Sequence, residues 1–121
     1  MNVVYHELLP ESYLLILAPG NSDVSEESLA HWLNRAECSG RSAVWVDCGM
    51  LSSLSNEAVQ LLWATHRQLL VQHAQLVLVH VSDRMQREIL GLEALGSAPC
   101  FVPTLLDAAL QTHWHQNNLA A

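Results

Sequence analysis

The sequence has 121 residues, the size of one domain with a core of its own. Its formal net charge is −7, with five arginines and no lysine, so nucleic acid and anionic membrane surfaces are unfavourable partners. No apolar run reaches the ~18–20 residues of a membrane span, and the N-terminus lacks the apolar segment of a secretory signal. Cys38, Cys48 and Cys100 form no CxxC motif, which predicts reduced thiols and a cytoplasmic location.

Alternating patterns and short continuous apolar runs predict five strands. These segments are Val3–Leu8, Tyr13–Ala18, Ala43–Asp47, Gln75–Val81 and Cys100–Val102. A turn at Pro10 joins the first two, which predicts an antiparallel hairpin. The later strands alternate with helices, so we expect them to pair in parallel through right-handed crossovers.

Helical spacing of apolar residues, together with capping residues, predicts four helices. The expected segments run from Asp23 or Ser25 to Gly40, from Glu57 to His73, from Asp83 to Leu95, and from Thr104 through Leu110. Thr104 and Asp107 resemble a capping box for the last helix, whose apolar face is predicted to be Leu106, Ala109 and Leu110. Residues 113–121 lose this periodicity and are expected to fray.

The order of these elements predicts an α/β fold with a single sheet of four to five strands and about four helices. We expect one domain over residues 1–121, ordered over about 3–112. Trp32, Trp45 and Trp63 fall on or beside core faces and are interpreted as packing residues. An exposed tryptophan would instead indicate a partner surface.

Motifs for catalysis, nucleotide binding and metal binding are absent from the sequence. The seven histidines, including His66 and His73, lack acidic or cysteine partners at ligand spacing, so they are interpreted as surface residues. Cys48 follows a strand and precedes a helix, but no base lies at a compatible spacing. The sequence therefore predicts a protein that is not an enzyme and uses no cofactor or metal.

The most polar junction of the chain runs from Cys48 to Asn56, between the strand Ala43–Asp47 and the helix that follows. Function collects in open α/β sheets where the carboxyl end of a strand meets a helix. Ser53, Ser55 and Asn56 are all good N-cap residues for this helix.

Three stretches, VWVDCGMLSSLSNEAVQLL, QLVLVHVSDRMQREILGLEALG and FVPTLLDAAL, together resemble the STAS family of anti-sigma-factor-antagonist-like domains. The resemblance covers Val3 to Leu110 and implies a STAS-like fold. It also implies protein–protein interaction in bacterial signal transduction and transcription regulation, with an anti-sigma kinase or a signalling assembly as the partner. A soluble STAS-like subunit of a membrane lipid-transport complex is the alternative, and homo-oligomerisation is left open.

The family's signature at the helix start is Asp-Ser-Ser-Gly, whose first serine is phosphorylated by the partner kinase. The signature aspartate falls on Ser55, the phospho-acceptor on Asn56, and the last two positions on Glu57 and Ala58. Two hypotheses follow: the domain stays in one binding state, or Ser55 or Ser53 takes the phosphate instead. The predicted partner-binding and switch residues are Ser52, Ser53, Ser55, Asn56, Glu57 and Ala58.

Overall fold

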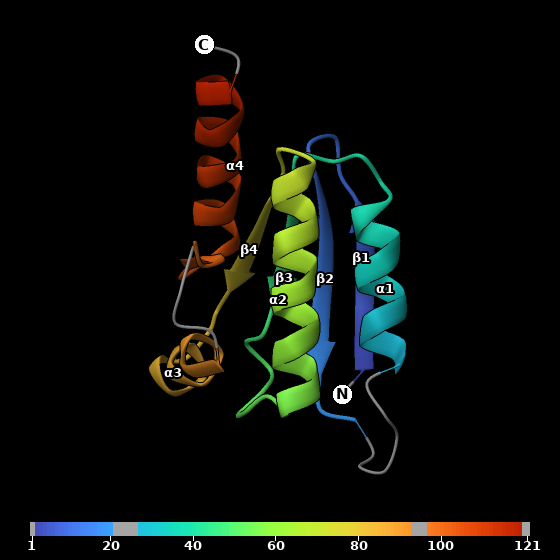
Figure 1. Cartoon of the computed structure of the whole chain (residues 1–121), viewed down its shortest axis with the longest axis vertical. Helices are drawn as coiled ribbons and strands as arrows, with labels where there is room; N and C mark the ends of the chain where they lie inside the picture. The colour runs from blue at the N-terminus through green and yellow to red at the C-terminus, as the bar shows by residue number, and fades with distance from the viewer. Residues whose placement is uncertain (1, 21–26, 93–96, 120–121) are drawn as a thin grey trace.

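The computed structural model describes residues 2–20, 27–92 and 97–119, and these residues form one five-stranded sheet with four helices (Figure 1). The strands are β1 (Asn2–Leu8), β2 (Ser12–Ala18), β3 (Ala43–Asp47), β4 (Gln75–Val79) and β5 (Cys100–Val102). The helices are α1 (Glu27–Glu37), α2 (Asn56–Val71), α3 (Asp83–Leu92) and α4 (Leu105–Leu119). The strand order is β1-β2-β3-β4-β5, with β1 antiparallel to β2 and the others parallel, which confirms the predicted fold class.

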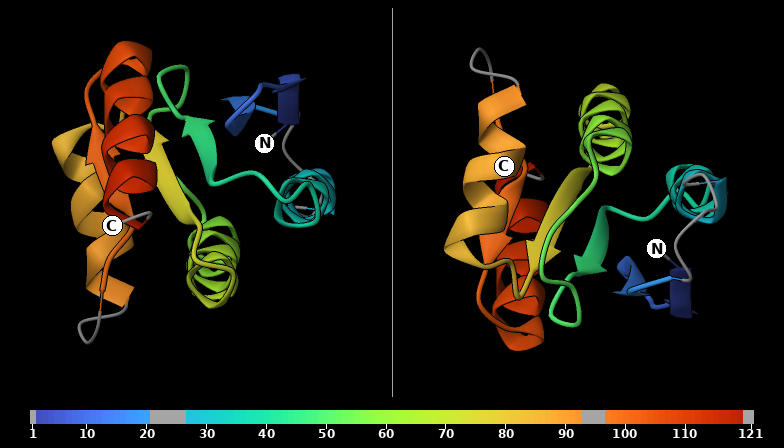
Figure 2. Two further views of the ribbon diagram at one scale, coloured as in Figure 1. Left: turned by 90° about the horizontal axis from the view of Figure 1, so that it is seen from above. Right: turned by 90° about the horizontal axis from the view of Figure 1, so that it is seen from below.

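The sheet separates two layers of helices: α1, α2 and α3 pack on one face and α4 packs on the other (Figure 2). The central strands are buried on both faces, and their side chains alternate between the layers. In β3, Val44 and Val46 point into the first layer, whereas Trp45 points towards α4. This two-sided burial explains why the strand sequences are continuous apolar runs.

The core between the sheet and α1, α2 and α3 is built from large aliphatic side chains. Its fully buried members include Leu15, Leu17, Leu29, Leu33, Leu62, Leu69, Leu76, Leu78, Met85 and Ile89. Trp63 is also buried here, and its Nε1 donates a hydrogen bond to the carbonyl oxygen of Ile89 at 2.8 Å. Since that bond joins α2 to α3, it fixes the position of α3 against the longest helix of this layer.

The opposite face of the sheet makes a thinner contact with α4 through small side chains. Ala108 and Thr112 are buried, and Trp45 Nε1 donates a hydrogen bond to Thr112 Oγ1 at 2.9 Å. The predicted apolar face of α4, formed by Leu106, Ala109 and Leu110, is wrong, because all three residues are exposed. The bulky indole fills the space beside the sheet, so the helix turns Ala108 and Thr112 inward, with Leu105 partly buried beside them, and Leu106 and Leu110 outward.

Two boundaries differ from the sequence prediction because of backbone conformation. β4 ends at Val79 rather than Val81, since His80 has φ 57°, in the left-handed region that interrupts a strand. α2 ends at Val71, and His73 has φ 60°. The first turn of α1 at Asp23 or Ser25 and the end of α3 at Leu95 lie outside the described residues.

α4 is longer than expected, because it continues to Leu119 through residues that were predicted to fray. Its start is as predicted: Thr104 Oγ1 donates to Asp107 Oδ2 at 2.7 Å, and Asp107 N donates back to Thr104 Oγ1 at 3.2 Å. Within the part of the chain that the structure describes, no helix combines the length and hydrophobicity needed to cross a bilayer.

Candidate docking site

The candidate site is the loop of residues 48–55 between β3 and α2, together with the first turn of α2; we call it the docking loop. Its first support is the carboxylate of Asp47, the last residue of β3. Asp47 Oδ1 accepts a hydrogen bond from Gly49 N at 2.8 Å, and both carboxylate oxygens lie 3.2 Å from His80 Nδ1. The β3–α2 loop is therefore tied to the end of β4 at the carboxyl edge of the sheet.

Gly49 sits against this pair so closely that a side chain has little room. A Cβ atom at Gly49 would lie 3.1 Å from both Asp47 Oδ1 and the Cβ of His80. The backbone of the loop is held on the same side, because Cys48 N donates to the carbonyl oxygen of Val79 at 2.9 Å. Glycine at this position thus permits the close approach of two loops.

The second half of the docking loop is anchored by Leu54. Its side chain is buried in the core of α1, α2 and α3, and its backbone N–H donates to Glu88 Oε2 of α3 at 3.3 Å. Arg84 Nε lies 3.3 Å from Glu88 Oε1. The Glu88 carboxylate therefore contacts the docking loop through Oε2 and Arg84 through Oε1. The loop therefore has fixed ends on two neighbouring elements.

Between these supports the docking loop presents an apolar side chain to solvent. The side chain of Met50 is 59% exposed, and Ser52 and Ser53 beside it are exposed as well. Leu51 is half-buried against the core. A flexible thioether at the tip of a fixed loop is well suited to contact a protein partner, because methionine adapts to irregular surfaces.

The docking loop ends in the predicted cap of α2. Ser55 is the N-cap, with Oγ accepting a hydrogen bond from Ala58 N at 3.1 Å. Asn56 and Glu57 follow as exposed residues of the first turn, where the helix dipole favours the negative charge of Glu57. Ala58 is fully buried, so this one predicted contact residue lies in the core and not on the surface.

The arrangement of the site disfavours chemistry at Cys48. Its side chain is buried, and burial together with the neighbouring Asp47 carboxylate raises the pKa of the thiol to about 12. A thiol in this environment stays protonated and is a poor nucleophile at neutral pH. Among the described residues, no group of three or more histidine, cysteine, aspartate or glutamate side chains is arranged to hold a metal ion.

One histidine differs from the surface interpretation. His66 is buried in α2, and its Nε2 lies 2.9 Å from the carbonyl oxygen of Ser97. Since a carbonyl oxygen can only accept, Nε2 carries the proton of this hydrogen bond. The spacing from Val59 and Leu62 places position 66 on the core face, which was the signal in the sequence for its burial.

Sequence comparison and structural comparison give different information about this chain. No protein-family model matches the sequence, and no curated protein matches it. Solved structures are nevertheless similar over almost the whole chain. RsbS of Moorella thermoacetica carrying a serine-to-glutamate substitution superposes with a TM-score of 0.77, at 12% identity over 97% of each chain.

Two further solved structures agree with this match. The anti-sigma factor antagonist SpoIIAA in its unphosphorylated form gives a TM-score of 0.67 at 16% identity, over 88% of this chain and 94% of SpoIIAA. A chain of the stressosome, described as a signal integration and transduction hub, gives 0.71 at 11% identity, over 96% of this chain and 98% of that one. All three are STAS-domain proteins, so the fold of this chain is the STAS fold, as the sequence resemblance indicated.

Proposed function

We propose that this chain is a non-enzymatic regulator of the anti-sigma-factor-antagonist kind that binds a protein partner through the docking loop and the first turn of α2. The observation that carries the proposal is the exposed side chain of Met50 on a loop whose two ends are fixed. A fixed loop loses little conformational entropy on binding, so an exposed apolar residue on it contributes more of its contact energy to affinity.

The chemistry around the loop supports binding rather than catalysis. Its only thiol is buried with a raised pKa, and Ser55 Oγ accepts a hydrogen bond from a backbone N–H of α2. The similar structures named above are regulators, which favours an anti-sigma kinase or a signalling assembly as partner over a lipid-transport complex.

Photo-crosslinking in the source cell tests the docking surface. Benzoylphenylalanine in place of Ser53 should crosslink one protein partner, whereas the same residue in place of Gln68, exposed near the far end of α2, should not. Met50→Asp should reduce the crosslink at least tenfold, because it places a charge at the centre of the contact. Equal yields from positions 53 and 68, or insensitivity to the Met50 substitution, would rule out this surface.

We further propose that the docking surface is kept in one charge state. Asn56 stands where the family carries its phospho-acceptor and has no hydroxyl, while Glu57 keeps a permanent negative charge in the first turn. The rival is phosphorylation of Ser55 or Ser53. A phosphate on the N-cap residue would lie near exposed N–H groups at the positive end of the helix dipole.

Intact-mass measurement separates the two ideas. The chain is incubated with the partner kinase, whose activity is verified on its own substrate in the same reaction. We expect no added mass. Addition of one phosphate that disappears in Ser55→Ala, and persists in Ser53→Ala, would assign the modification to the cap and disprove the single-state proposal.

A further inference from the structure

The outward face of α4 carries a stripe of large apolar side chains. Leu106, Leu110 and Trp114 are 70%, 60% and 60% exposed, and they follow one another at intervals of four residues. Residues four apart lie on one side of a helix, so the three form a continuous ridge about 12 Å long at 1.5 Å per residue. We call this ridge the α4 stripe.

No described part of the chain covers the α4 stripe. The inward side of α4 is already fixed by Ala108 and by Thr112, which accepts the hydrogen bond of Trp45 Nε1. Rotating the helix to bury the leucines would break that bond and leave a buried indole N–H without its acceptor. With α4 held in this orientation, the stripe faces away from the sheet.

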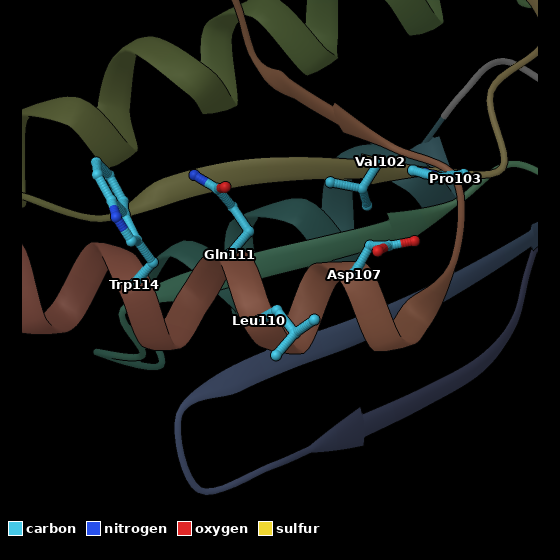
Figure 3. Close-up of a pocket in the computed structure, with 6 residues that line it drawn as sticks. All are labelled: Val102, Pro103, Asp107, Leu110, Gln111 and Trp114. Atoms are coloured by element: carbon cyan, nitrogen blue, oxygen red, sulfur yellow. The ribbon is translucent and has the colours of Figure 1, made fainter.

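An open groove runs beside the stripe, between α4 and the end of β5 (Figure 3). It has a volume of about 590 Å³ and is lined by Val102, Pro103, Asp107, Leu110, Gln111 and Trp114. β5 is an edge strand of the sheet, so nothing in the sheet order continues beyond it. The stripe and the groove together form a ridge next to a hollow, a shape that can fit a second copy of itself.

The distribution of charge indicates that a second copy of this chain can bind to the α4 stripe. The chain as a whole carries a net charge of −7, which opposes self-association at most surfaces. The sequence of α4 contains a single residue that is charged at neutral pH, Asp107. In an antiparallel pair of α4 helices centred on Leu110, the Asp107 residues of the two copies lie towards opposite ends of the contact. The two helices therefore bring no pair of like charges together.

We propose that a second copy of this chain binds to the α4 stripe, forming a two-fold symmetric dimer with Leu110 on the axis. Leu106 of each copy packs against Trp114 of the other, because both lie four positions from the centre. A two-fold contact uses the same patch on both subunits, as this self-complementary spacing requires. Tryptophan at such a contact supplies a large share of the binding energy.

The dimer is independent of the proposed function, because it uses the helix on the other face of the sheet from α2. It leaves both docking loops accessible, so one dimer would present two docking surfaces to a multivalent partner. A contact made by one helix face is smaller than a standard interface of ~800 Å² per partner, so we expect a dissociation constant on the order of tens of micromolar.

Sedimentation velocity over a concentration series of the full chain tests the dimer. The unaltered chain should pass from monomer to dimer as the concentration rises. Leu110→Glu and Leu110→Lys should each weaken dimerisation at least tenfold, although they change the net charge in opposite directions. An equimolar mixture of the two variants should dimerise again, because the two-fold axis places the new glutamate against the new lysine.

Val71→Glu is the matched control, since Val71 is an exposed apolar residue at the end of α2. It adds the same charge as Leu110→Glu and should leave the dimer intact. Circular dichroism checks that every variant is folded. A chain that stays monomeric at millimolar concentration, equal loss in the Val71 variant, or a mixture that does not dimerise would each overturn the proposal.

Discussion

The two faces of the sheet are packed in different ways. The face under α1, α2 and α3 is covered by large aliphatic side chains such as Leu62 and Leu69, whereas the face under α4 is covered by Ala108 and Thr112 around one indole. The first layer buries Leu62 and Leu69 and leaves Leu70 and Leu90 partly exposed at its rim, whereas the second layer leaves Leu106 and Leu110 more exposed, at 70% and 60%. The leucines that α2 turns inward therefore contribute to stability, and those that α4 turns outward remain available for association.

The largest expected effect comes from truncating the same residue type in the two layers. Leu62→Ala, in the buried core, should lower the free energy of unfolding by about 2–5 kcal/mol through lost burial and a residual cavity. Leu110→Ala, on the α4 stripe, should change it by less than about 0.5 kcal/mol. Urea denaturation at a concentration where the chain is monomeric measures both. Similar losses at the two positions would mean that α4 buries the stripe.

The next effect concerns the polar contact that fixes α4. Thr112→Val preserves the shape of the side chain and removes the acceptor of Trp45 Nε1. It should therefore lower the free energy of unfolding by about 1–3 kcal/mol. Thr112→Ser retains an oxygen and is the matched control. In a Trp45→Phe background, Thr112→Val should cost clearly less, because phenylalanine has no N–H to leave unpaired. An unchanged cost in that background would show that the hydrogen bond does not hold the helix.

The different packing of the two layers also explains which parts of the structure were predictable from the sequence. The buried strands β2, β3 and β4 were predicted to within two residues, because burial on both faces requires continuous apolar runs between turn residues. The rotation of α4 was not, because Leu105, Leu106, Ala109 and Leu110 surround its first turns and allow more than one apolar face. The deciding contact lies 67 residues away in sequence, between Trp45 and Thr112. The need of a buried indole N–H for an acceptor was the one available signal.

In the docking loop, too, features set by local sequence were predictable and contacts between distant residues were not. The sequence predicted a cap at Ser53, Ser55 or Asn56 because capping depends on local residue types near the start of a helix, and the structure identifies Ser55. The contacts of Asp47 with His80 and of Leu54 with Glu88 join residues that are 33 and 34 positions apart. No local sequence pattern could therefore predict them. Met50 was not among the predicted partner-binding residues, because its exposure on the loop depends on these distant contacts and is visible only in the structure.

A third prediction compares two glycines, one at the docking loop and one on α3. Gly49→Ala should destabilise the fold by about 1–3 kcal/mol, because the added Cβ crowds Asp47 Oδ1 and His80 at 3.1 Å. Gly91→Ala has open space around its Cβ on a helix and should stabilise the fold by about 0.5–1 kcal/mol. Thermal unfolding measures both, and a stabilising Gly49 substitution would show that the two loops are not held together by this contact.

The smallest effect compares the caps of α2 and α4. Ser55→Ala and Thr104→Ala should each lower the free energy of unfolding by about 1 kcal/mol, since each removes an oxygen that accepts a hydrogen bond from a backbone N–H in the first turn. Ser53→Ala, in the same loop but before the cap, should change stability by less than about 0.5 kcal/mol. Ser55→Asp should retain most of the stability, because a carboxylate also caps the helix and is favoured by its dipole.

The pattern of these cap variants bears on both surfaces of the molecule. The Thr104 cap starts the helix that carries the α4 stripe, so Thr104→Ala should weaken dimerisation if its first turn unwinds and releases Leu106. Ser55→Ala should leave the dimer unchanged, because it acts on the other layer. Denaturation and sedimentation of the same variants measure this separation. Weakening of the dimer by Ser55→Ala would show that the two layers of helices do not act independently.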